Sequence, residues 1–263
     1  MKKALIAVAL VAVSVPALAQ QKAPEPDYTI SGNFGIFSDY RYRGISQTDL
    51  RPAVQGGFDF AHKSGFYLGN WNSNIADFTA ASSNIEMDFY GGYKFESAGL
   101  GFDIGTIYYS YPGATKNPST SPLEEYDTHE VYLGVSYGPV TFKTSYTVSD
   151  GYFGISKGVT FGTGSMSGSA KGTVYYDLSF TKEIAPKTTL SAHVGYLDLD
   201  GVQGEFDLTD FRLGIAYDLG PAVIGLTAYS NDIGSNAKAN FTNTGEGKRL
   251  YKDSVVLSLT KTF

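Results

Sequence analysis

The chain has 263 residues, a formal net charge of −6 at pH 7 and no cysteine. The lack of cysteine excludes disulfides, thiolate metal sites and covalent haem attachment, and the acidic balance argues against a nucleic-acid partner, because phosphates require basic patches. Only 17% of the residues are charged, while Gly, Tyr and Phe number 31, 20 and 17, a composition that suits an all-β chain with aromatic faces.

The first predicted element is a secretory signal peptide over residues 1–19. Lys2 and Lys3 precede an apolar run that is too short to span a membrane, and Ala17 and Ala19 are the small residues that a signal peptidase reads. We expect the mature chain to start at Gln20, which changes the net charge from −6 to −8 because both lysines are removed. Residues 20–27 would be a short periplasmic segment, and residues 28–263 a single domain.

From residue 28 onward, apolar and polar residues alternate repeatedly, and no segment has a convincing helical period. The clearest run is IEMDFYGGYKF, in which Ile85, Met87 and Phe89 share one face while Glu86 and Asp88 share the other. Such runs predict about twelve strands, each near the ten residues that a tilted strand needs to cross a bilayer. They lie near 28–41, 50–61, 65–73, 84–96, 99–111, 126–137, 139–149, 172–184, 188–198, 209–219, 221–230 and 250–263.

The connections between these strands alternate in length. Short turns are predicted at 62–65, 96–100, 137–139, 185–188 and 218–221, and longer loops at 42–49, 74–83, 112–125, 150–171, 199–208 and 231–249. This alternation predicts a transmembrane, antiparallel, up-and-down β-barrel with both termini in the periplasm. A secreted soluble sandwich or barrel remains the alternative, because alternation does not say which face points inward.

The last predicted strand ends on an aromatic residue, Phe263. An alternating strand with this ending resembles the signal that the barrel assembly machinery of the bacterial outer membrane recognises. Lys261 interrupts the apolar row, which is tolerable at the membrane interface because a long side chain can snorkel.

Three strings in the first third of the domain carry a family resemblance: SDYRYRGISQ, PAVQGG and GFYLGNWNSN, all between residues 38 and 74. They are similar to the TorF family of porin-like outer-membrane proteins, and the rest of the chain matches in architecture more than in sequence. The resemblance implies an outer-membrane barrel with a pore role. It supplies no substrate and no catalytic motif.

The candidate site residues are the polar side chains on the face taken as inward. In SDYRYRGISQT we expect Asp39, Arg41 and Arg43 to face the lumen near its mouth, and Tyr40 and Tyr42 to lie in the outer aromatic girdle. The predicted pore-lining set is Asp39, Arg41, Arg43, Asp59, Glu86, Asp88, Lys94, Asp103, Glu130, Lys143, Asp177, His193, Asp210, Arg212 and Lys252.

Two long loops have other possible uses. Loop 149–172 is rich in Gly and Ser; we expect a mobile external loop, with a constriction folded into the mouth as the alternative. Its GTGSMSG string lacks the strand-to-helix context of a phosphate-binding turn. Residues 198–210 gather five acidic side chains, which predict a solvated acidic rim, with a Ca²⁺ site as the alternative. No cofactor is expected.

The sequence therefore predicts an outer-membrane channel for passive diffusion of small hydrophilic solutes or ions, in contact with outer-membrane lipid and lipopolysaccharide. Selectivity would come from pore radius and luminal charge. Two alternatives remain: a barrel lipid hydrolase that uses the lipid-facing His129, for which no serine or amide partner is evident, and a structural or adhesive barrel that acts through its loops. The sign of ion selectivity, the openness of the lumen and the oligomeric state are left open.

Overall fold

The computed structural model describes residues 26–76, 82–115, 123, 125–203, 206, 208–243 and 246–263. The predicted signal peptide at 1–19 and most of the segment at 20–27 lie outside the described residues.

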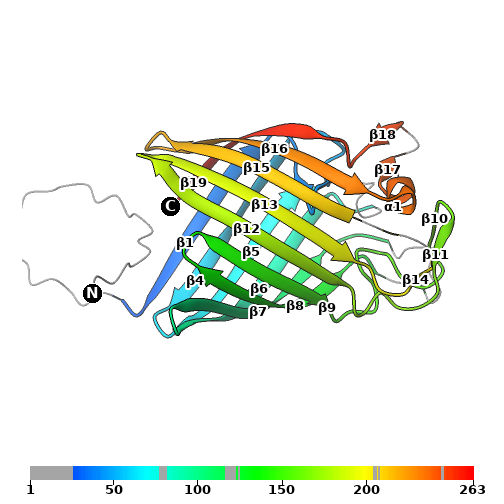
Figure 1. The fold of residues 1–263 in the computed structure, drawn as a ribbon, viewed down its shortest axis with the longest axis horizontal. Coiled ribbons are helices and arrows are strands. Elements are labelled where there is room, and N and C mark those ends of the chain that lie inside the picture. Colours follow the sequence, from blue (N-terminus) through cyan, green and yellow to red (C-terminus); the bar gives the residue numbers. More distant parts are fainter. Residues whose placement is uncertain are drawn as a thin grey trace, which may run out of the picture.

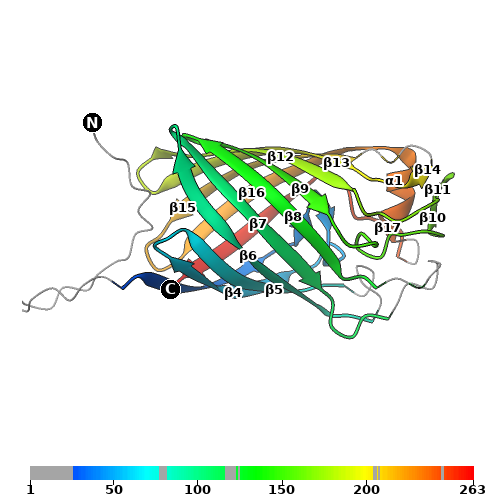
Figure 2. The same ribbon diagram turned by 90° about the horizontal axis from the view of Figure 1, so that it is seen from below.

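Twelve antiparallel strands close into a barrel in the order β1-β19-β16-β15-β13-β12-β9-β8-β7-β6-β5-β4 (Figures 1 and 2). They are β1 Tyr28–Phe37, β4 Ala53–His62, β5 Phe66–Asn74, β6 Ile85–Ser97, β7 Leu100–Ser110, β8 Thr128–Tyr137, β9 Val140–Thr147, β12 Val174–Ala185, β13 Thr188–Asp198, β15 Leu208–Asp218, β16 Val223–Ile233 and β19 Ser254–Thr262. The predicted fold class is confirmed, and each of the twelve predicted strands corresponds to one strand of the barrel, with bounds that differ by up to four residues.

The apolar face of each strand points outward. Ile85, Phe89 and Tyr93 on β6 are exposed, whereas Glu86 and Asp88 between them are buried inside the barrel. A soluble barrel would have the opposite arrangement, because its apolar face fills the interior. The exterior therefore suits lipid contact, and the fold is that of an outer-membrane β-barrel.

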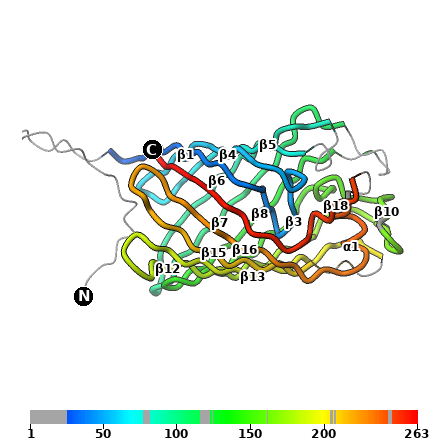
Figure 3. Tube along the Cα trace, turned by 90° about the horizontal axis from the view of Figure 1, so that it is seen from above, coloured from blue at the N-terminus to red at the C-terminus, as the bar shows by residue number. Residues whose placement is uncertain are grey.

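Small elements gather at one end of the barrel, as Figure 1 shows. They are β10 Thr160–Phe161, β11 Gly164–Met166, β14 Val202–Gln203, α1 Ser235–Asn240, β17 Thr242–Asn243 and β18 Lys248–Arg249. Two further short strands, β2 Arg41–Tyr42 and β3 Ile45–Ser46, pair with each other. No helix within the described residues is long and apolar enough to cross a membrane. The tight turns and the C-terminus lie at the opposite end (Figure 3), which makes that end the periplasmic one.

The C-terminal residue closes the seam of the barrel. The backbone N–H of Gly32 donates to the carbonyl of Phe263 at 2.7 Å, and the N–H of Phe263 donates to the carbonyl of Gly32 at 2.9 Å. A Cβ at Gly32 would stand 2.6 Å from the Phe263 ring, so Gly32 leaves the room that the ring occupies. The ring itself is largely exposed.

We propose that the Phe263 ring serves assembly rather than stability. In Phe263→Ala both seam hydrogen bonds remain possible, so we expect the refolded barrel to lose little stability, while the amount of folded barrel in the outer membrane falls severalfold. Heat-modifiable electrophoretic mobility measures both quantities. Phe95→Ala removes another exposed aromatic ring and is the control; equal levels of Phe263→Ala and wild type would contradict the role.

Candidate functional site

A short hairpin, residues 38–52, leaves the wall and enters the barrel. β1 ends at Phe37, and β2 and β3 pair inside the bore through Arg41 with Ser46 and Tyr42 with Ile45. Arg43 and Gly44 between them have positive φ angles of 46° and 78°, a turn conformation that glycine adopts without steric cost. The predicted first strand over 28–41 is therefore too long.

The two tyrosines of the hairpin face the interior, so their predicted place in the outer aromatic girdle is wrong. Tyr40 is buried, lies 5.3 Å from the Trp71 ring and donates a hydrogen bond to Glu86 at 3.3 Å. The hydroxyl of Tyr42 donates to that of Tyr109 at 2.9 Å. Both side chains occupy the bore instead of contacting lipid.

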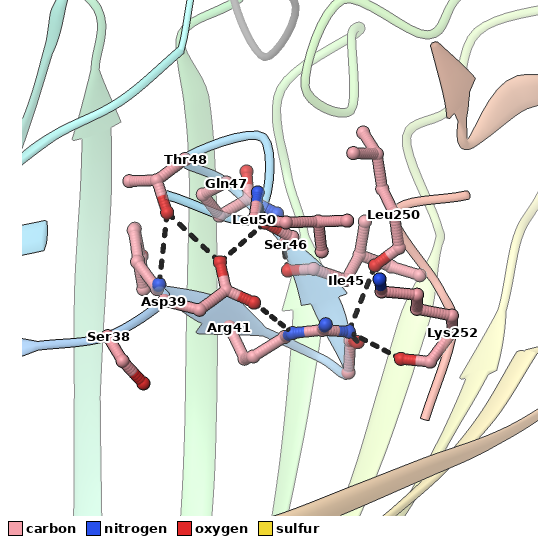
Figure 4. A network of polar contacts seen from close by, with 12 residues as sticks. Ser38, Asp39, Arg41, Ile45, Ser46, Gln47, Thr48, Leu50, Leu250 and Lys252 are labelled. Atoms are coloured by element: carbon pink, nitrogen blue, oxygen red, sulfur yellow. Dashed lines mark hydrogen bonds and ion pairs between the residues drawn. The ribbon is translucent and has the colours of Figure 1, made fainter. Parts of the chain in front are cut away.

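A polar network fixes the base of the hairpin (Figure 4). Asp39 pairs with the Arg41 Nε at 2.6 Å and accepts hydrogen bonds from Ser46 and Thr48 at 2.6 and 3.0 Å. The Nη1 of Arg41 donates to the carbonyls of Leu250 and Lys252, at 3.0 and 3.1 Å. The network thus joins the hairpin to the segment that leads into β19.

Arg43, at the tip of the hairpin, contacts the opposite wall of the barrel. Its two Nη atoms donate to the two carboxylate oxygens of Glu130 on β8, at 2.9 and 2.8 Å, and Nη1 also donates to the Tyr152 hydroxyl at 2.7 Å. The guanidinium lies 4.1 Å from the centre of the Tyr175 ring on β12. Since β8 and β12 lie across the barrel from β1, the hairpin spans the bore.

The charge of this arginine is secure in spite of its burial. Burial acts to lower the pKa of Arg43, but the Glu130 carboxylate together with Tyr152, Tyr42 and Tyr109 holds the pKa well above its usual value. A bidentate, buried ion pair of this kind is rigid, because its geometry is fixed by two parallel hydrogen bonds.

The loop between β9 and β12 packs over the hairpin. Tyr152, Ile155, Val159 and Met166 from this loop are buried in one apolar cluster with Ile45 of the hairpin. This packing favours the alternative prediction, a loop folded into the mouth, over a free external loop. Apolar side chains such as Val159 and Met166, spaced through a Gly- and Ser-rich segment, were the signal for this packing.

Two cavities lie on either side of the hairpin. One, of about 290 Å³, lies between the hairpin and the covering loop and is lined largely by aromatic and aliphatic side chains, among them Ile45, Tyr152 and Phe241. The other, of about 190 Å³, is lined by charged side chains of the hairpin and of strands β9 to β16. Tyr42 and Arg43 line both cavities, so the hairpin separates them.

Five predicted pore-lining carboxylates are buried at or near the hairpin: Asp39, Glu86, Asp88, Glu130 and Asp210. Glu130 is paired with Arg43. One oxygen each of Glu86 and Asp88 has no hydrogen-bond partner in the described part of the chain.

Asp59, Lys94 and Asp103 line the wall formed by β4 to β7. Tyr90 donates to Asp59 and Tyr67 donates to Asp103, each at 2.6 Å. Lys94 lies 3.9 Å from Asp103, and the hydroxyls of Tyr67 and Tyr132 are hydrogen-bonded. Tyrosines thus hold the acidic side chains of this wall in place.

The facing wall, β9 to β16, carries Lys143, Asp177, His193, Asp210 and Arg212. His193 lies between two carboxylates: its Nδ1 is 3.1 Å from Asp177 and its Nε2 is 2.9 Å from Asp210. Lys143 lies 4.7 Å from the centre of the Tyr132 ring. Lys252, by contrast, is exposed in the segment before β19.

The described acidic residues at 198–210, which are Asp198, Asp200 and Asp210, do not form one metal-binding group. Glu205 and Asp207 lie outside the described residues, while Asp210 faces the bore and is buried. In the part of the chain that the structure describes, no group of three or more His, Cys, Asp or Glu side chains could hold a metal ion.

Sequence reasoning missed the tyrosines. Tyr109, Tyr152 and Tyr175 contact the hairpin, but alternation did not single them out, because aromatic residues also serve the lipid-facing girdles. For two of these tyrosines, the strand face that they share with charged residues was the sequence signal for an inward position. Tyr175 shares a strand face with Asp177, and Tyr109 shares one with Asp103.

Comparison with known proteins supports the architecture. A family model described as "Bacterial protein of unknown function (Gcw_chp)" matches residues 21–263, and a search of curated proteins finds no match. Among solved structures, the KdgM porin aligns with a TM-score of 0.50 and 8% identity over 89% of this chain and 98% of its own. The KdgM porin in complex with disordered oligogalacturonate aligns with a TM-score of 0.50 and 7% identity over 89% and 97%. The NanC porin aligns with a TM-score of 0.49 and 8% identity over 89% of this chain and 98% of its own.

Proposed function

The chain belongs to the Gcw_chp family, and we propose that it is an outer-membrane channel through which small hydrophilic solutes diffuse passively. The observation that carries this proposal is the contrast between the two surfaces of the wall. The outer surface is apolar and aromatic, whereas charged and hydroxyl side chains line the bore on both sides. A lining of this kind suits water and polar solutes.

The hairpin would limit what such a channel admits. It spans the bore and is fastened at its base by Arg41 and at its tip by Arg43. We therefore expect a narrow pore and a small unitary conductance. The oligogalacturonate named with one KdgM porin is a hydrophilic solute, which agrees with the class proposed here.

The first test is single-channel recording of the purified, refolded chain in a planar bilayer under a salt gradient. We expect stepwise openings of low conductance, and the reversal potential gives the sign of ion selectivity. Silent membranes that contain folded barrel, verified by heat-modifiable mobility, would contradict a channel.

A lipid hydrolase remains the second candidate because of one contact on the lipid-facing wall. The Thr106 hydroxyl lies 2.6 Å from the His129 Nε2, which supplies the hydroxyl partner that the sequence did not reveal. Against this, the same hydroxyl donates to the carbonyl of Glu130 at 2.9 Å, and a catalytic histidine needs a third group to orient it. A phospholipid hydrolysis assay on the bilayer-tested preparation separates the two functions.

A further inference from the structure

Positively charged side chains converge on the 190 Å³ cavity at the periplasmic side of the hairpin. Arg41 and Arg43 line it from the hairpin, and Lys143, His193 and Arg212 line it from strands β9, β13 and β15. They come from four separate segments of the chain, so the closed barrel is required to bring them together.

The carboxylates around this cavity already have hydrogen-bond donors. Asp177 accepts from Ser179 at 2.5 Å and lies 3.1 Å from the His193 Nδ1. Asp210 accepts from Tyr175 at 2.7 Å and lies 2.9 Å from the His193 Nε2. When both ring nitrogens of His193 are protonated, each of these four oxygens has a donor within the protein.

One buried cationic donor, in contrast, lacks an acceptor. The Arg41 side chain is 0% exposed, and its Nη2 has no hydrogen-bond partner. Lys143 faces the Tyr132 ring, and Arg212 interacts with the Tyr229 hydroxyl. Within the described residues, neither Lys143 nor Arg212 forms an ion pair. A buried donor without a partner requires an explanation, and a bound ion is one.

We propose that this cavity binds a small oxyanion, a carboxylate or phosphate group, through Arg41, Lys143 and Arg212. The proposal rests on the channel function, because the cavity would then lie on the path of the solute. A cation would meet five basic side chains against two carboxylates in the lining, and an uncharged polyol would not offset the excess positive charge. An oxyanion supplies only acceptors, and charge-assisted hydrogen bonds to it are strong.

The test is isothermal titration of the purified chain in detergent, in a buffer free of other oxyanions, with inorganic phosphate and with succinate as separate probes. We expect binding of at least one probe, and the tighter one identifies the anion class. Lys143→Gln and Arg212→Gln should each weaken that binding by about tenfold or more, because each removes one charge-assisted contact. Lys182→Gln removes an exposed lysine elsewhere on β12 and should bind as wild type does.

The proposal would be overturned if folded wild-type protein bound neither probe. It would also be overturned if Lys143→Gln and Arg212→Gln both bound the probe as tightly as the wild type does. The two variants lie on different strands, so if one fails to fold the other decides. Bilayer recordings distinguish failure of the channel function from failure of the anion site. A barrel that binds the anion but does not conduct would contradict the channel function and leave the site in place. A barrel that conducts but does not bind the anion would contradict the site alone.

Discussion

Replacing Glu130 with glutamine is expected to release the tip of the hairpin and to raise the single-channel conductance severalfold. The substitution keeps the shape of the side chain but leaves Arg43 as a buried cation without a counter-charge, since Glu130 is its ion-pair partner at 2.8 Å. Breaking a buried pair in this way costs about 3–5 kcal/mol, which corresponds to a shift of roughly 10²-fold to 4 × 10³-fold toward the released state. Planar-bilayer recording measures the change.

The barrel itself should survive this substitution. The ladder hydrogen bonds of β8 with β7 and β9 are made by the backbone and do not depend on the Glu130 carboxylate. The double variant Arg43→Gln with Glu130→Gln removes both charges, so we expect its conductance to fall back toward the wild-type value. Wild-type conductance in Glu130→Gln alone would show that charge pairing does not hold the hairpin in place.

The wall of the barrel could be predicted because it follows from a local period. Alternation places Ile85 and Phe89 on one face and Glu86 and Asp88 on the other whatever the rest of the chain does. The strand at 188–198 was predicted with the bounds that β13 has. The order of the strands follows as well, because short and long connections alternate and each strand pairs with its neighbour in sequence.

The hairpin could not be predicted in the same way, because its contacts are distant in sequence. The alternation of Asp39, Arg41 and Arg43 with tyrosines continues the pattern of β1, so nothing local marks Phe37 as the end of that strand. The turn at Arg43 and Gly44 reverses the chain inside the bore, and partners such as Glu130, 87 positions away from Arg43, hold the tip there. The residues of the site were therefore identifiable as charged, inward-facing groups, but their pairing was not.

Gly44→Val is expected to displace the tip of the hairpin from its contacts with the barrel wall and to make the tip accessible to protease. A Cβ at Gly44 would stand 1.9 Å from the Asn231 Oδ1 and 2.7 Å from the Asp210 Cβ, both on the wall. The φ angle of +78° adds strain for a β-branched residue. Arg41 and Arg43, with side chains 0% and 7% exposed, should then become cleavable by trypsin.

Gly220→Val is the matched control, because Gly220 also has a positive φ, +95°, but nothing lies within 4 Å of its Cβ position. It should cost about 1–2 kcal/mol of strain and leave both arginines protected. If trypsin still failed to cleave at Arg41 and Arg43 in folded Gly44→Val, the tip would have to occupy another position inside the bore.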